Sequence, residues 1–381
     1  MQIRNPQSVR QESLVQIETD IECTIVAKRD VPILAINNSK YQAFQLRPRE
    51  EYKYVEFRDI ELIKQIGEGG FSKVYLVNNK KTKTEHALKS IRKDFMLSNG
   101  QVESIKQERD IMKAMNHPFI IKLQEVFNQQ ARIYFLMPYY PLGNMRQQLR
   151  LQGKFPEEIV RLMAAQLTLA IATLHAKGIV YRDLKPENIL VGNDGYMVLA
   201  DFGVSRQLKP GEASLGRVGT VDYIAAEIYR GQPHSFPVDW WSLGVLLYEL
   251  LVSQAPFYHD DLEQTEWNVK NLPLRWPDPK HHGPGFSFKP TTKSFIRGLL
   301  DKDPKKRLGG VEGPLEVLRH PYFEGLDFAK LEKKELKLNW TPKMPQPPQQ
   351  ARAAVIEESV VSRAQLELVL QNKQKFSHFE E

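Results

Sequence analysis

Two polar segments in the middle of the chain constrain its fold more than any other feature. Residues 181–188 read Tyr-Arg-Asp-Leu-Lys-Pro-Glu-Asn, and residues 201–203 read Asp-Phe-Gly. Phosphoryl transfer requires an acceptor that orients the attacking hydroxyl, hard oxygen ligands for Mg²⁺, and cations that offset the charge on the transferring group. Asp183 suits the first role, and Asn188 with Asp201 suits the second. The segments therefore predict two loops that meet at a site for phosphoryl transfer.

A glycine-rich turn precedes these segments. The run Gly67-Glu68-Gly69-Gly70 separates two apolar, strand-like stretches, residues 60–66 and 74–77. Its exposed backbone N–H groups and missing Cβ atoms would let phosphates approach closely, although an ordinary hairpin turn also explains such a run. The dinucleotide-binding form of the motif requires a helix directly after the glycines. A strand is predicted there instead, which excludes a Rossmann domain.

Two lysines are candidates for the cationic role. Lys185 belongs to the first polar segment, and Lys89 lies on a predicted strand at residues 87–91. A lysine on a strand is usually a solvated edge residue. However, the predicted helix at residues 102–115 supplies Glu108, whose carboxylate could hold the Lys89 ammonium toward phosphate oxygens.

The pattern of apolar residues changes at the turn Pro141-Leu142-Gly143. Before this turn, short apolar stretches predict a small β-rich lobe with one long helix. After it, helical spacing predominates. The predicted elements of this second part are helices at residues 159–174, 238–251 and 291–300, with short strands at 189–191 and 197–199. The fold class expected from this order is α+β.

Composition excludes several classes of protein. The 381 residues include one cysteine, Cys23, so an intrachain disulfide is impossible and a reducing compartment is expected. The net charge of +7 forms no basic stripe interleaved with aromatic residues, which argues against a nucleic-acid or membrane-surface module. The most apolar stretch, residues 238–252, is interrupted by two acidic residues and is shorter than the roughly 20 residues that cross a bilayer. We expect a cytoplasmic location, with nuclear entry left open, and no transmembrane segment.

Together these motifs resemble those of the eukaryotic protein kinases. Asp239-Trp240-Trp241-Ser242-Leu243-Gly244 looks like the long central helix, and residues 303–309 resemble the segment whose arginine, Arg307, pairs with a glutamate, here Glu227. Tyr181-Arg182-Asp183, Asn116-His117-Pro118-Phe119-Ile120 and Arg307-Leu308-Gly309 are similar to the AGC group of serine/threonine kinases. Lys185-Pro186-Glu187 also resembles the serine/threonine form of the catalytic loop.

The resemblance implies a two-lobed protein kinase fold, with a β-rich N-lobe that has one main helix, a mainly helical C-lobe, and a C-terminal tail that wraps the N-lobe. It implies an N-terminal extension (1–57) with short β segments and no assignable function, a kinase domain (58–323) and a tail (324–381). Within the kinase domain, the N-lobe would cover residues 58–137, the hinge 138–143 and the C-lobe 144–323.

The resemblance also implies a site for ATP and Mg²⁺ between the lobes. Met137 would be the gatekeeper, and Met112, Leu123, Tyr181 and Phe202 would stack as a spine on Asp239. The implied catalytic residues are Asp183, Lys185, Lys89 and Glu108, and the implied metal ligands are Asn188 and Asp201. The implied nucleotide-binding residues are Ile66, Gly67, Glu68, Gly69, Gly70, Phe71, Ser72, Val74, Ala87, Lys89, Met137, Pro138, Tyr139, Tyr140, Asn144, Glu187 and Leu190.

Several positions depart from the pattern of the AGC group. Gly216 stands where relatives carry a phosphorylatable threonine, and Ser214 lies two residues away. An upstream kinase could phosphorylate Ser214, which would then dock on Arg182, or the activation segment could be ordered without phosphorylation; both remain open.

The expected peptide specificity is also affected. Val221 replaces a proline that positions the peptide, and Asn144 replaces a glutamate that binds ribose and a substrate arginine. Because Glu187 and Glu249 could still attract arginines, we expect some preference for basic peptides.

The end of the chain carries a regulatory motif. Phe376-Ser377-His378-Phe379 resembles the hydrophobic motif with which AGC kinases clamp their own N-lobe, and a frayed terminus is the alternative. Glu380 stands where many relatives carry a phosphorylated residue, so its carboxylate is expected to mimic phosphate.

The leading hypothesis is therefore a serine/threonine protein kinase that acts as a monomer on proteins bearing Ser or Thr. The alternative is a pseudokinase that serves as a nucleotide-binding scaffold. Loss of Lys89, Asp183 or Asp201 would have favoured the scaffold, and none of them is lost.

Overall fold

The computed structural model describes residues 55–69, 72–278, 280, 286–345 and 361–379, together with the backbone of three short strands. These strands, β1 (Val15–Ile17), β2 (Cys23–Lys28) and β3 (Val31–Ala35), pair antiparallel in a sheet of their own. They lie within the N-terminal extension, where short β segments were expected.

A five-stranded antiparallel sheet forms the small lobe. Its spatial order is β4 (Ile60–Glu68), β5 (Ser72–Asn79), β6 (Glu85–Arg92), β8 (Arg132–Pro138) and β7 (Glu125–Asn128). The glycine-rich run connects β4 to β5, and the register opposes Gly67 to Val74. A strand therefore follows the glycines, as predicted.

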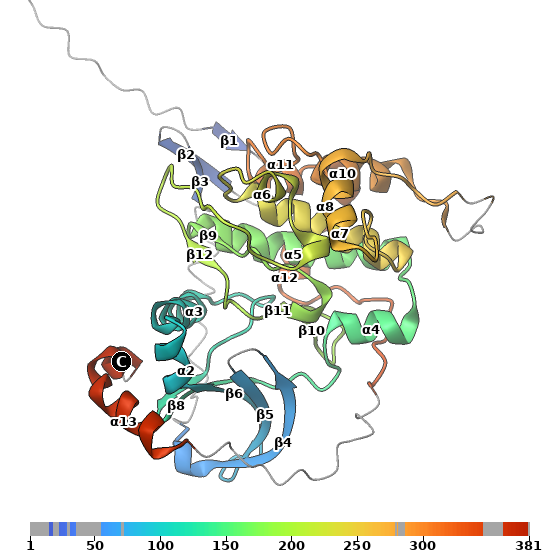
Figure 1. Ribbon diagram of the computed structural model, residues 1–381. Helices are drawn as coiled ribbons and strands as arrows, with labels where there is room; N and C mark the ends of the chain where they lie inside the picture. Colours follow the sequence, from blue (N-terminus) through green and yellow to red (C-terminus); the bar gives the residue numbers. More distant parts are fainter. Residues whose placement is uncertain are drawn as a thin grey trace, which may run out of the picture.

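Two helices accompany this sheet in Figure 1, and a short 3-10 turn, η1 (Phe57–Asp59), precedes it. The helices are α2 (Lys93–Ser98), which the sequence did not predict, and α3 (Val102–Ala114), which it did. Helix α3 buries Ile105, Glu108 and Met112 at the three-to-four-residue spacing of one helical face. Glu108 therefore lies on the face of α3 that packs inward.

Helices dominate the other lobe, which lies apart from the five-stranded sheet in Figure 1. Its longest helices are α5 (Glu157–Ala176) and α7 (Pro237–Val252). The other helices among the described residues of this lobe are α4 (Met145–Gln152), α6 (Ala226–Tyr229), α8 (Leu262–Asn271), α10 (Pro290–Leu299), α11 (Pro314–Leu318) and α12 (Phe328–Glu332). Short elements carry the loops between them: β9 (Ile179–Val180) with β12 (Arg206–Gln207), β10 (Ile189–Val191) with β11 (Met197–Leu199), and the 3-10 turns η2 (Pro186–Asn188), η3 (Val221–Tyr223) and η5 (Pro321–Phe323).

Helix α7 is the centre of the C-lobe core, and α10 packs closely against it. A Cβ atom added at Gly244 would lie 2.9 Å from Leu299 Cβ and 2.9 Å from Leu300 Cγ. Real Cβ atoms do not approach so closely in well-packed interiors, so this contact requires glycine. The sequence predicted both helices to within about one residue of their observed ends.

Helix α5 is long and apolar enough to cross a membrane by length and composition alone. Most of it is buried among other helices, including α7, as is usual for the core helix of a globular domain. The expectation that the chain has no membrane span overlooked this helix as a candidate.

The tail ends in α13 (Arg363–Gln371) and η6 (Lys373–Phe379), which lie beside α2 and α3 in Figure 1. Phe376 and Phe379 are buried, with rings 4.9 Å from the Lys93 ammonium and 4.9 Å from the Arg109 guanidinium, respectively. Asn128 Nδ2 donates to the carbonyl of Phe376 at 2.9 Å. The end of the tail, residues 361–379, therefore packs on the small lobe, whereas Leu336 and Trp340 of the earlier tail contact Tyr196 and Phe155 of the C-lobe. Glu380 lies outside the described residues.

Candidate active site

Charged side chains from both lobes meet between β6, α3 and the Asp-Phe-Gly segment. Lys89 Nζ lies 2.6 Å from Glu108 Oε1 and 3.6 Å from Asp201 Oδ1. Glu108 is almost fully buried, whereas the Asp201 side chain is 55% exposed. The structure thus brings together three of the predicted residues, and Asp201 presents its carboxylate to solvent.

Electrostatics keeps Lys89 and Asp201 ionised. Burial alone would lower the pKa of Lys89, but Glu108 and Asp201 outweigh it and raise that pKa above its usual value. The Lys89 ammonium in turn lowers the pKa of the Asp201 carboxyl. At neutral pH the crevice therefore holds a fixed cation beside a fixed anion, as binding of a phosphate and a divalent metal would require.

The catalytic loop forms a hydrogen-bonded network around Asp183. Asn188 Nδ2 donates to Asp183 Oδ2 at 2.9 Å, and Lys185 Nζ lies 2.8 Å from the same oxygen. Thr220 Oγ1 donates to Asp183 Oδ1 at 2.9 Å and accepts from Lys185 Nζ at 2.8 Å. The sequence analysis did not place Thr220 in the site, because its contact with Asp183 joins residues 37 positions apart.

Asp239 of α7 fixes the backbone of this loop. Its carboxylate accepts from the N–H of Tyr181 at 2.9 Å and from the N–H of Arg182 at 2.8 Å, and it lies 2.8 Å from His175 Nε2. Arg182 and Asp201 adopt left-handed backbone conformations, with φ of +69° and +58°. Such conformations cost free energy in residues other than glycine, so the surrounding contacts must hold them in place.

The expected spine residues are all buried. The Tyr181 and Phe202 rings pack edge to face with centroids 5.5 Å apart. Met112 and Leu123 belong to the same buried cluster. The Asp-Phe-Gly phenylalanine therefore points into the core while Asp201 faces the crevice, an arrangement that keeps Asp201 available for a metal.

The other expected nucleotide-binding residues come from both lobes. Ala87 lies opposite Met137 in the β6–β8 register, and Val74 and Leu190 are partly buried. Most of the other nucleotide-binding candidates are partly buried or exposed along the glycine run and hinge: Ile66, Gly67, Glu68, Gly69, Ser72, Pro138, Tyr139 and Tyr140. Gly70 and Phe71 lie outside the described residues.

Asn144 has a structural role that the sequence did not predict. Its side chain accepts from the N–H of Gln147 at 3.0 Å, and the Gln147 side chain accepts from the N–H of Asn144 at 3.0 Å. This reciprocal pair is a capping box at the start of α4. The Oδ1 atom of Asn144 is therefore committed to the helix, which leaves Nδ2 as the donor that it can offer a ribose.

The residues present fit a magnesium ion. Asp201 and Asn188 supply a carboxylate and an amide, the hard oxygen donors that Mg²⁺ accepts. Because Asn188 uses Nδ2 toward Asp183, its Oδ1 is the atom that it could offer the metal. Within the described residues, no group of three or more His, Cys, Asp or Glu side chains forms a metal site. Such a pair suits an ion that takes its remaining ligands from phosphate and water.

Ser214 is buried between two arginines of the activation segment and catalytic loop. Its Oγ lies 3.1 Å from Arg182 Nη1 and 3.2 Å from Arg206 Nη1. Its backbone pairs with His234 in both directions, at 2.8 and 2.9 Å. The unmodified hydroxyl therefore already contacts the arginine that was expected to receive a phosphate.

A buried ion pair anchors the end of the activation segment. Arg307 Nη1 and Nη2 donate to the two carboxylate oxygens of Glu227, each at 2.7 Å. Arg307 also donates to the carbonyls of Asp301 and Pro237, at 2.9 and 2.8 Å. The pairing expected from the sequence is present.

Arg146 of α4 occupies the acidic cluster to which a substrate arginine was expected to bind. Its Nε donates to Glu187 Oε1 at 2.8 Å, Nη1 donates to Glu249 Oε1, and Nη2 donates to Tyr223 Oη at 3.1 Å. The sequence gives no signal for this contact, because Arg146 is an ordinary arginine of an amphipathic helix, far along the chain from both glutamates.

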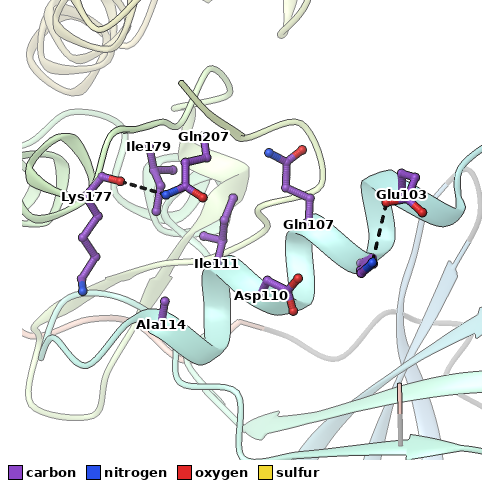
Figure 2. Close-up of a pocket in the computed structure, with 9 residues that line it drawn as sticks. Glu103, Gln107, Asp110, Ile111, Ala114, Lys177, Ile179 and Gln207 are labelled. Carbon is purple, nitrogen blue, oxygen red and sulfur yellow. Dashed lines mark hydrogen bonds and ion pairs between the residues drawn. The ribbon is translucent and has the colours of Figure 1, made fainter. Parts of the chain in front are cut away.

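A surface cavity of about 420 Å³ lies between α3 and the C-lobe. Figure 2 shows Glu103, Gln107 and Asp110 along α3, with Lys177 and Gln207 on the neighbouring C-lobe segments that complete the lining. None of the predicted catalytic, nucleotide-binding or metal-binding residues lines this cavity, so it is distinct from the site around Asp183.

Comparisons with known proteins agree with this geometry. Residues 60–323 match the family described as "Protein kinase domain". The chain is 37% identical over 290 residues to serine/threonine-protein kinase AtPK1/AtPK6 of Arabidopsis thaliana, covering 75% of this chain and 60% of the relative. It is 36% identical over 286 residues to protein kinase 2 of Dictyostelium discoideum, covering 75% and 58%. It is 33% identical over 274 residues to cAMP-dependent protein kinase type 3 of Saccharomyces cerevisiae, covering 72% and 66%. The chain thus spans about three fifths of the length of the first two relatives.

Proposed function

Because the chain belongs to the protein kinase family and its named relatives are serine/threonine kinases of the AGC type, we propose that it is an active ATP-dependent protein serine/threonine kinase. The observation that carries this proposal is the convergence of Lys89, Glu108 and Asp201 in one crevice. The network around Asp183 adjoins it, because Asn188 donates to Asp183 and its carbonyl accepts from the N–H of Ala200, the residue before Asp201, at 2.9 Å. A scaffold that only bound nucleotide would have no need of the Asp183 network.

In this mechanism each residue acts through the atom that it presents. Asp183 Oδ1, held by Thr220, orients the substrate hydroxyl and receives its proton as the hydroxyl oxygen bonds to the γ-phosphorus of ATP. The bond between that phosphorus and the β–γ bridging oxygen breaks, and ADP leaves. Lys185 Nζ, fixed between Asp183 and Thr220, lies where it can offset negative charge on the transferring group.

Lys89 binds the phosphate oxygens that stay with the nucleotide, and Glu108 orients its ammonium. Asp201 and Asn188 would hold Mg²⁺, which neutralises charge on the β- and γ-phosphates when it is bound.

We propose that the activation segment is ordered without phosphorylation. Burial of Ser214 and its contacts with Arg182 and Arg206 support this state. Phosphorylation by an upstream kinase is the alternative, because a phosphate would pair with both guanidinium groups. Mass spectrometry of the active protein distinguishes the two.

We also propose that Phe376 and Phe379 hold the tail on the small lobe as a permanent clamp of α3. Their burial beside Lys93 and Arg109 supports this role. Since α3 carries Glu108, the clamp would stabilise the Lys89–Glu108 pair.

The test is transfer of radiolabelled phosphate from ATP to an arrayed library of Ser and Thr peptides in the presence of Mg²⁺. We expect transfer by the full chain and loss of at least about 1,000-fold with Asp183→Ala, since the hydroxyl loses its acceptor. Binding of a fluorescent ATP analogue to both proteins is the control. A parent protein that binds the analogue but transfers nothing would refute the proposal, and so would undiminished transfer by Asp183→Ala.

A further inference from the structure

The geometry points to Arg146 as a specificity-determining residue: we infer that its guanidinium fills the acidic peptide subsite beside Asp183, so that the enzyme does not select arginine there. This inference rests on the proposed function and refines its substrate class. It also runs against the preference for basic peptides that the sequence suggests, because that preference depends on Glu187 and Glu249 being free.

Arg146 is well matched to the cluster that it occupies. Three of its nitrogens donate to Glu187, Glu249 and Tyr223, and its side chain is only 22% exposed. Tyr223 Oη also donates to Glu249 Oε2. Both oxygens of the buried Glu249 carboxylate are thus already hydrogen-bonded within the protein, which lowers their capacity to accept from a ligand.

The cluster borders the place where a substrate peptide must lie. Glu187 belongs to the same 3-10 turn as Asn188, which donates to Asp183. Tyr223 ends the turn that begins just after Thr220, the other partner of Asp183. An extended peptide advances about 3.3 Å per residue, so side chains within a few residues of a serine at Asp183 reach this cluster.

Charge explains why the cluster would otherwise bind arginine. Glu187 and Glu249 lie close to Asp222, whose pKa is raised by burial and then by Glu249, so these carboxyls repel one another. Arg146 relieves this repulsion. A second guanidinium would meet hydrogen-bonded carboxylates and a like charge, which would cancel most of the attraction.

The experiment compares peptides that differ in one group. Each peptide carries one serine and either arginine or citrulline, its uncharged analogue, at one of the four positions on either side. For the parent protein we expect kcat/KM to differ by less than about threefold within each pair. For Arg146→Ala we expect the arginine peptide to be preferred about 10- to 100-fold at one position, equivalent to about 1.4 to 2.7 kcal/mol.

Two variants make the comparison specific. Arg150→Ala removes an exposed arginine one turn further along α4. Like the parent, it should show similar kcat/KM values for the arginine and citrulline peptides. Arg146→Ala combined with Glu249→Gln removes the carboxylate as well and should lose most of the new preference. Thermal unfolding of each variant establishes that it is folded. If the unpaired Glu249 carboxylate destabilises Arg146→Ala, the double variant should regain stability, because it no longer carries that charge.

Fluorescence anisotropy with labelled versions of the same peptides measures their dissociation constants, which do not depend on phosphate transfer. A parent protein that prefers arginine more than tenfold would overturn the inference, as would a folded Arg146→Ala that gains no preference in either assay. If the parent transfers no phosphate but the binding preference appears in Arg146→Ala, the inference holds and the proposed function fails.

Discussion

Replacing Glu227 by glutamine removes the negative half of an ion pair that lies wholly inside the C-lobe. The Arg307 and Glu227 side chains are 0% and 2% exposed, and two parallel hydrogen bonds of 2.7 Å join them. The Arg307 guanidinium also lies 5.2 Å from the centre of the Trp241 ring. Its positive charge cannot reach water when the carboxylate is gone, so the variant must keep an uncompensated buried charge.

The magnitude follows from this burial. Removal of one partner of a buried pair costs about 3–5 kcal/mol. Glutamine can still accept one hydrogen bond from Arg307. We therefore expect Glu227→Gln to lower the free energy of unfolding by about 3 kcal/mol, the lower end of this range. We expect about 4–5 kcal/mol for Arg307→Met, because the carbonyls of Asp301 and Pro237 also lose a donor. The double variant should cost less than the sum of the single variants by about 2 kcal/mol or more, since it leaves no unpaired charge.

Urea denaturation at neutral pH, followed by tryptophan fluorescence, gives the free energies of unfolding for this cycle. Glu367→Gln is the matched control, because the Arg363–Glu367 pair has side chains that are 94% and 58% exposed and should contribute less than about 0.5 kcal/mol. A loss below about 1 kcal/mol for Glu227→Gln, or strictly additive single variants, would refute this reasoning.

Three further outcomes are expected. Alanine at Phe376 and Phe379 together should release the tail, increase hydrogen exchange in η6 and lower phosphate transfer; unchanged exchange there would show that the rings do not hold the tail. Ser214→Ala should cost about 1–2 kcal/mol in the free energy of unfolding, because Arg182 and Arg206 lose a shared partner, whereas a cost near zero would show that water replaces the hydroxyl. The pKa of Lys302 is lowered from 10.5 to about 8 by burial and by its arginine neighbours. Between these two pH values the unfolded chain binds more protons than the folded protein, so the free energy of unfolding of the parent relative to Lys302→Met should rise from pH 8 to 10.5. A difference in the free energy of unfolding that does not change with pH would contradict the lowered pKa of Lys302.

The main helices and the catalytic loop could be predicted because their signals are local. Helices α3, α5, α7 and α10 repeat apolar residues at helical spacing, and the residues that surround Asp183 come largely from one short segment. Helix α8 was missed because it buries few side chains, which leaves little periodicity to recognise.

The contacts that were missed depend on tertiary structure. Arg146 meets Glu187 and Glu249 only because α4, η2 and α7 are adjacent in the folded C-lobe, and a single sequence carries no trace of that adjacency. The contact of Arg182 with Ser214, 32 residues away, likewise depends on the folded loops. The resemblance to the kinase family suggested that Asn144 contacts the nucleotide. In the structure its side-chain oxygen instead accepts a hydrogen bond in the capping box of α4.

The hydrogen bonds from Tyr181 and Arg182 to Asp239 tie the reaction centre to α7, a helix that is buried over almost its whole length. Any small displacement of α7 therefore moves the loop that carries Asp183 along with it. The position of Asp183 is thus maintained by the same packing that keeps the C-lobe folded. Substitutions far from the nucleotide can slow turnover without touching a reacting atom, and inactivation on heating should coincide with melting of this lobe.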